Sequence, residues 1–184
     1  MLRPLIVTLV CGAVALLAQP KTAQAAQDTL SGTVSAQEFQ EVMESQGMVV
    51  AQSLTPDGYP QLSAETDDGI KFVVYFYRCD GVNFERCRLL QFRASFECDS
   101  RFAGFDINGF NRQWVYGKAY RWQNGNISVE HPIRVTGGVT RDNLIEHVAL
   151  WQSIVSDWTV HVGWDEAQLA APGGSGSCND AIKM

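Results

Sequence analysis

The central part of the chain alternates hydrophobic and polar residues with a period of two. Residues 90–96 show the pattern most strictly, with Leu, Phe and Ala side chains separated by polar ones. Such alternation is typical of a β-strand with one buried and one solvated face. Residues 70–77 have the strongest β propensity, and residues 48–54 and 61–66 are apolar enough for two weaker strands. Turn residues separate these segments, so the pattern predicts antiparallel strands.

Three further segments have the features of helices. The segment 35–46 opens with a capping box of Ser and Glu and carries apolar residues on one side. Asp106 is placed to cap a short helix that runs to about Trp114. Thr140 is placed to cap a longer helix. Its apolar residues repeat at helical spacing: Leu144, Ile145, Val148, Trp151, Ile154, Val155 and Trp158.

A hairpin is predicted between the short and the long helix. Residues 115–122 and 127–135 read as strands, and Asn124 and Gly125 between them are the residues that best fit a tight type I′ turn. The order is therefore a helix, antiparallel strands, a short helix, a hairpin and a long helix. Such segregation predicts an α+β fold in which an antiparallel sheet carries helices on one face.

The first residues have the pattern of an export signal. Arg3 supplies a positive start, residues 5–17 are an uncharged apolar run, and an Ala-Gln-Ala sequence at 23–25 suits a signal peptidase. The run is shorter than the ~20 residues of a transmembrane helix. We therefore expect cleavage near Ala26 and a periplasmic or secreted protein without a stable membrane anchor.

This reading divides the chain into four parts. Residues 1–25 are the signal peptide and 26–34 a flexible lead-in. Residues 35–163 form one globular domain, and 164–184 form a tail rich in Gly, Pro and Ser. The mature length fits a single domain with one hydrophobic core.

Four cysteines remain after the expected cleavage: Cys79, Cys87, Cys98 and Cys178. An even number in an oxidising compartment predicts two disulfides, for which three connectivities exist. We favour Cys79 with Cys87, because each ends an apolar strand pattern, and this leaves Cys98 for Cys178. A zinc site is the weaker alternative, since no Cys-x-x-Cys occurs. The three histidines are also scattered: His131, His147 and His161.

The charge and the motifs exclude several function classes. The net charge is −6, and the expected cleavage removes two basic residues and no acidic one, which gives −8. An acidic chain without a Lys/Arg cluster is a poor ligand for nucleic acid. Neither Gly-x-Ser-x-Gly nor His-Glu-x-x-His occurs. Asp67 and Asp68 lack the spacing of a calcium loop and fit a turn. We therefore expect no catalytic residue, metal or cofactor.

One short motif before the hairpin places an amide, a guanidinium and an indole close together. Asn111, Arg112 and Trp114 are residue types that occur at binding hot spots. The alternative, which the helical spacing favours, is that Phe110 and Trp114 pack into the core while Arg112 stays in water.

Several segments together resemble the YbjN family, whose members are labelled bacterial sensory transduction regulators. The similarity runs from about residue 35 to 162 and rests on five segments: 72–79, 87–94, 110–112, 117–120 and 137–140. The resemblance implies an α+β fold like that of type III secretion chaperones, which are small acidic dimers that hold extended polypeptide. It also implies no catalytic residues. Lys118 and Tyr120, in the fourth segment, complete the candidates for partner binding together with Asn111, Arg112 and Trp114.

Two functions follow as hypotheses. The first is an exported, non-enzymatic module that engages a protein or peptide partner, as a monomer or a homodimer, by strand addition at an open sheet edge or in a groove. The second is a small-ligand sensor of the cell envelope. Its apolar pocket would be lined by four aromatic residues: Tyr75, Tyr77, Trp114 and Trp122.

Overall fold

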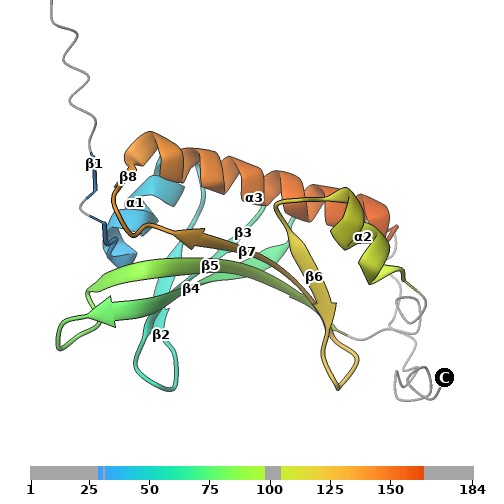
Figure 1. Ribbon diagram of the computed structural model, residues 1–184, viewed down its shortest axis with the longest axis horizontal. Helices are drawn as coiled ribbons and strands as arrows, with labels where there is room; N and C mark the ends of the chain where they lie inside the picture. Colours follow the sequence, from blue (N-terminus) through green and yellow to red (C-terminus); the bar gives the residue numbers. More distant parts are fainter. Residues whose placement is uncertain (1–28, 31, 98–104, 164–184) are drawn as a thin grey trace, which may run out of the picture.

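The computed structural model describes residues 29–30, 32–97 and 105–163. The expected signal peptide and the tail at 164–184 lie outside this part of the chain. The described residues form an antiparallel sheet with helices on one face, which is the predicted α+β architecture (Figure 1).

Six antiparallel strands form the main sheet in the order β2-β3-β4-β5-β7-β6. Their bounds are β2 Ala51–Leu54, β3 Pro60–Glu65, β4 Lys71–Asp80, β5 Arg86–Phe96, β6 Lys118–Arg121 and β7 Ile127–Arg134. A second sheet pairs β1 (Thr29–Leu30) with β8 (Val139–Thr140). Two residues of the lead-in expected to be flexible are therefore paired with the segment before the last helix.

Three helices begin at the predicted caps. They are α1 Ala36–Ser45, α2 Ile107–Gln113 and α3 Arg141–His161. Ser35 and Glu38 exchange both hydrogen bonds of the capping box, at 3.1 and 2.7 Å. Asp106 and Thr140 accept hydrogen bonds from the first turns of α2 and α3, at 2.8 and 3.1 Å. The helix starts were predictable because each cap satisfies a backbone N–H that the helix itself leaves unpaired.

The core lies between the sheet and the helices α1 and α3 (Figure 1). The alternation in β5 is confirmed, since its apolar residues are all buried: Leu90, Phe92, Ala94 and Phe96. Phe92 is stacked with Trp151 of α3 at 5.3 Å between ring centroids and meets Phe39 of α1 edge-on at 5.7 Å. Such aromatic pairs add to the stabilisation from area burial alone. This trio therefore joins both helices to the centre of the sheet.

The β6–β7 hairpin turns through three residues rather than the two of the predicted type I′ turn. Trp122 N–H donates to Asn126 O at 2.8 Å, and Gly125 N–H donates to Trp122 O at 2.9 Å. Gly125 has a φ of +89°, whereas Asn124 is not among the described residues with positive φ. A type I′ turn needs positive φ at both central residues, so the loop is a type I turn followed by a bulge glycine.

The strand before this turn is also shorter than predicted. Residues 115–122 were expected to be extended, but β6 begins at Lys118. A Cβ added at Gly117 would lie 2.6 Å from Ile154 Cγ2, so the chain passes against α3 at this point. The carbonyl of Tyr116 is hydrogen-bonded to the side chain of His131 at 2.9 Å. Contacts with α3 and β7 therefore replace the expected start of the strand.

Candidate functional site

The sheet has a second face that no described helix covers, and we call it the helix-free face (Figure 1). The strand register aligns its side chains opposite the buried ones. On β3 to β7 they include Glu65, Lys71, Val73, Tyr75, Tyr77, Leu89, Gln91, Arg93, Ser95, Lys118, Tyr120, Ser128, Glu130, Pro132 and Arg134. The solvated face of an antiparallel sheet is commonly polar. Three tyrosines on it therefore need an explanation.

A partly buried ion pair lies at the centre of this face. Arg93 Nε donates to Glu130 Oε1 at 2.7 Å, and the two side chains are only 23% and 9% exposed. The hydroxyl of Tyr120 donates to the same carboxylate oxygen at 2.6 Å. The pair spans β5 and β7, which are neighbours in the sheet. The carboxylate thus receives two hydrogen bonds, and both are charge-assisted because the acceptor is ionised.

Aromatic rings surround this pair. The guanidinium carbon of Arg93 lies 4.9 Å from the centre of the Tyr75 ring and 5.8 Å from that of Trp122, within cation–π range. Trp122 Nε1 donates to Ser128 Oγ at 2.8 Å. We call the following group the Arg93 cluster: Tyr75, Tyr77, Arg93, Tyr120, Trp122 and Glu130.

The surroundings of the cluster favour neutral phenols at Tyr77 and Tyr120 and a charged guanidinium at Arg93. Burial and the hydrogen bond to Glu130 raise the pKa of Tyr120 to about 12. Burial also raises the pKa of Tyr77, against the opposing effect of the Arg93 charge. For Arg93, burial acts to lower the pKa, but the hydrogen bond and charge of Glu130 raise it. These three pKa shifts all favour the charge state that each group already has at neutral pH.

Neither Arg93 nor Glu130 was predicted from the sequence as a functional residue. The alternation of hydrophobic and polar residues placed Arg93 on the solvated side of its strand, where an arginine is common and indicates no particular function. The detectable signal was in residues 127–133, where Ser128, Glu130 and His131 interrupt an otherwise apolar segment. All three are buried, and buried polar groups need partners.

The five residues predicted for partner binding do not form one surface. The amide of Asn111 exchanges two hydrogen bonds with the backbone of Ala119, at 2.9 and 2.8 Å. Arg112 is 71% exposed and pairs with Asp106 at 3.1 Å. Trp114 is half-buried and stacks on Phe110 at 4.7 Å. The remaining two, Lys118 and Tyr120, lie on the helix-free face.

The aromatic residues predicted to line one small-ligand pocket are also separated. Tyr75, Tyr77 and Trp122 belong to the Arg93 cluster on the helix-free face. Trp114 instead packs at the end of α3, with its ring 5.3 Å from that of His161. The four rings therefore do not enclose a common space.

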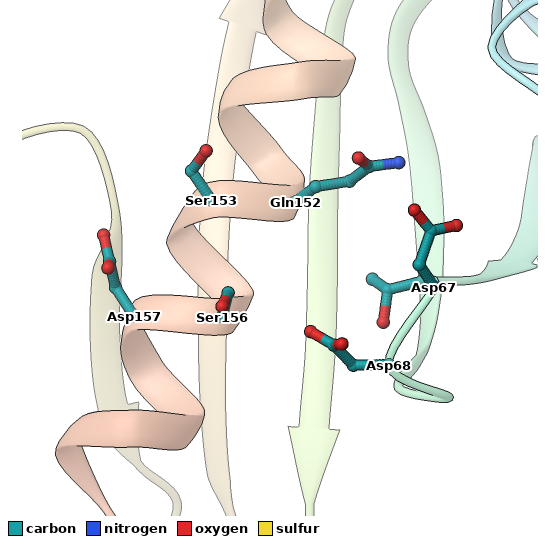
Figure 2. Close-up of a pocket in the computed structure, with 7 residues that line it drawn as sticks. Asp67, Asp68, Gln152, Ser153, Ser156 and Asp157 are labelled. Carbon is teal, nitrogen blue, oxygen red and sulfur yellow. The ribbon is translucent and has the colours of Figure 1, made fainter.

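A polar hollow of about 360 Å³ lies between the β3–β4 turn and α3. In Figure 2, Asp67 and Asp68 on the turn face Gln152 and Ser156 on the helix. Three of its lining residues are carboxylates and none is cationic. The full lining consists of Thr66, Asp67, Asp68, Gln152, Ser153, Ser156 and Asp157. In the described part of the chain, no group of three or more His, Cys, Asp or Glu is arranged to hold a metal ion.

One disulfide lies at the end of the β4–β5 hairpin. It joins Cys79 to Cys87, the pairing that the sequence favoured. Cys98 and Cys178 lie outside the described residues. The backbone of Cys87 also exchanges two hydrogen bonds with Val34, at 2.9 and 3.0 Å. The bridged hairpin thus holds the segment that leads into α1.

Two histidines share a hydrogen bond between β7 and α3. His131 Nε2 lies 3.0 Å from His147 Nδ1, and His131 Nδ1 lies 2.9 Å from the carbonyl of Tyr116. A carbonyl only accepts, so His131 donates from Nδ1, and its neutral form accepts from His147 at Nε2. Burial lowers the pKa of both imidazoles, and the mutual charge further lowers that of His147.

We expect the protein to lose stability in mild acid because of this pair. Both pKa values are lower in the fold, so the unfolded chain binds more protons, and the free energy of unfolding falls as the pH falls below about 6.5. A His147→Gln variant should have a shallower dependence, which urea denaturation at several pH values would measure. Equal slopes for the two proteins would contradict the assignment.

No helix in residues 29–30, 32–97 and 105–163 is long and apolar enough to cross a membrane.

The comparisons with known proteins agree with the α+β fold described above. A family model described as "Putative bacterial sensory transduction regulator" (YbjN) matches residues 35–164. A structural neighbour is the "Crystal structure of YbjN, a putative transcription regulator from E. coli", at 16% identity and a TM-score of 0.52 over 72% of this chain and 92% of that one. No curated protein matches. The family description supports a regulatory or binding role in general and is not that of an enzyme family. The chain thus belongs to the YbjN family.

Proposed function

We propose that the chain is a non-catalytic binding module that takes an extended segment of another polypeptide as an added strand along β2. The observation that supports the proposal most strongly is that the edge strand β2 is exposed and carries neither of two protecting features, a charge or a proline. All four residues of β2 are exposed, none is charged, and the strand contains no proline. Monomeric proteins commonly protect edge strands with charges, prolines or bulges. An unprotected edge therefore favours a polypeptide partner.

The geometry of β2 offers free backbone groups to such a partner. Thr55 N–H donates to Tyr59 O at 2.8 Å, and bonded pairs alternate along an antiparallel ladder. Gln52 and Leu54 therefore direct their N–H and C=O groups away from β3. Leu54 is 65% exposed, and its side chain adds apolar area beside these groups. Strand addition uses this combination of backbone bonds and side-chain contacts.

The other edge of the sheet is less suited to strand addition. Asn111 of α2 already bonds both backbone groups of Ala119 in the middle of β6. An incoming strand would have to displace this amide and break both of its hydrogen bonds, which opposes strand addition at this edge. The two edges are therefore not equivalent, and the proposal assigns the partner to β2.

The proposal also places this activity outside the cytoplasm. The apolar run at 5–17 supports export, and the disulfide between Cys79 and Cys87 supports an oxidising compartment. The partner would then be another polypeptide of the envelope or the exterior.

Photo-cross-linking of the full chain in its native cells tests the proposal. A photoreactive residue at Leu54 should capture one reproducible polypeptide, whereas the same residue at Val82, which is 98% exposed in the β4–β5 turn, should not. Gln52→Pro removes an outward N–H and should abolish the capture. Gln52→Thr keeps the N–H and should preserve it. Equal capture at both positions, capture of only a second copy, or insensitivity to Gln52→Pro would overturn the proposal.

A further inference from the structure

We infer that the helix-free face is a second binding surface, and that it takes an acidic, extended peptide segment. The inference goes beyond strand addition at β2, because the Arg93 cluster lies on β4, β5, β7 and β6, toward the opposite edge of the sheet. Two properties of the described residues support it: aromatic rings held in fixed positions and a local excess of positive charge. The sheet is also curved, and its helix-free face is the concave one (Figure 1).

The rings of this surface are held by their own polar atoms. The hydroxyl of Tyr120 is bonded to Glu130, and the indole N–H of Trp122 is bonded to Ser128. Ser128 Oγ on β7 lies 3.0 Å from Ser95 Oγ on β5, so the hydrogen bonds that hold Trp122 extend to the neighbouring strand. Trp122 is nevertheless 44% exposed. Rigid, partly exposed aromatic side chains cost little conformational entropy when they bind, which makes them effective contact residues.

The charge of this face is opposite to that of the whole chain. Arg93 and Glu130 neutralise each other. Among the strand positions of this face, the exposed cations that remain are Lys71, Lys118 and Arg134, against one exposed carboxylate, Glu65. The chain as a whole carries −6. A local positive field on an acidic protein favours an acidic partner that approaches this face.

The same charge balance favours a peptide over other anionic ligands. A nucleic acid or an anionic membrane extends its charge beyond the face and meets the acidic remainder of the protein. A peptide with a few carboxylates places its charge only where the cations are. Its apolar or aromatic side chains can then contact Tyr75 and Trp122, whose rings also flank the Arg93 guanidinium.

Binding of a random copolymer of glutamate and tyrosine tests the inference, with a copolymer of lysine and tyrosine as the control. Backbone amide NMR signals of β4, β5, β7 and β6 should shift with the acidic copolymer only. Lys118→Glu should weaken the binding about threefold to fivefold, as expected for one exposed charge contact. Arg141→Glu makes the same change of charge on the helix side and should have no effect.

Three results would overturn the inference: no shift with the acidic copolymer, equal weakening by both variants, or binding only to phosphatidylglycerol vesicles or to an oligonucleotide. The test of peptide binding at the helix-free face does not depend on strand addition at β2. Gln52→Pro acts at the edge strand β2, whereas Lys118→Glu acts on β6 at the other edge of the sheet. Each proposal can therefore fail while the other stands.

Discussion

Replacing Trp151 with alanine is expected to lower the free energy of unfolding by about 3–5 kcal/mol, the usual loss for a large aromatic residue removed from a core. Trp151 is completely buried, is stacked on Phe92, and meets Phe72 edge-on at 5.7 Å. The cavity left behind would lie between α3 and the middle of the sheet. Since whole domains are commonly stable by only ~5–15 kcal/mol, urea denaturation should show a large decrease in the transition midpoint.

A Trp151→Phe variant is the matched control. Trp151 Nε1 is a buried donor with no hydrogen-bond partner among the described residues. Phenylalanine keeps an aromatic ring against Phe92 and removes the unpaired N–H, so part of the packing loss is offset. We expect it to cost less than half as much as alanine. Equal losses for the two variants would mean that the ring contacts with Phe92 and Phe72 do not stabilise the fold.

The position of Trp151 in the core was predictable from the sequence, because its causes are local. The cap at Thr140 fixes where α3 begins, and helical spacing then fixes which residues share a face. The alternation around Phe92 similarly fixed which side of β5 is buried. Each of these features depends on residues that are near one another in the chain.

The candidate surfaces could not be predicted in the same way, because they depend on which strands become neighbours. Arg93 and Glu130 are 37 residues apart, and only the β5–β7 register brings them together. The unprotected state of β2 depends on its place at the end of the sheet. Asn111 looked like a contact residue, but its amide bonds the backbone of β6 once α2 packs beside that edge. Residue types alone do not distinguish these roles.

Replacing Glu130 with glutamine is expected to lower the free energy of unfolding by about 2–3 kcal/mol. Glutamine keeps the shape and an acceptor for Tyr120 but removes the charge that compensates Arg93, whose side chain is only 23% exposed. Denaturation of Arg93→Met, of Glu130→Leu and of the variant that combines these two substitutions would measure the coupling. Because the double variant leaves no unpaired charge, it should be more stable than the sum of the two single losses predicts.

Titration of the Tyr120 phenol gives an independent test of the same network. Burial and Glu130 raise its pKa to about 12 in the fold, above the ordinary value of 10. The folded protein therefore retains a proton that the unfolded chain loses, and this stabilisation is present below pH 10 and decreases between pH 10 and about 12. In Glu130→Gln, phenolate absorbance should appear at lower pH. An unchanged phenol titration would mean that Glu130 does not hold Tyr120, and the fixed aromatic surface that we infer would lose its support.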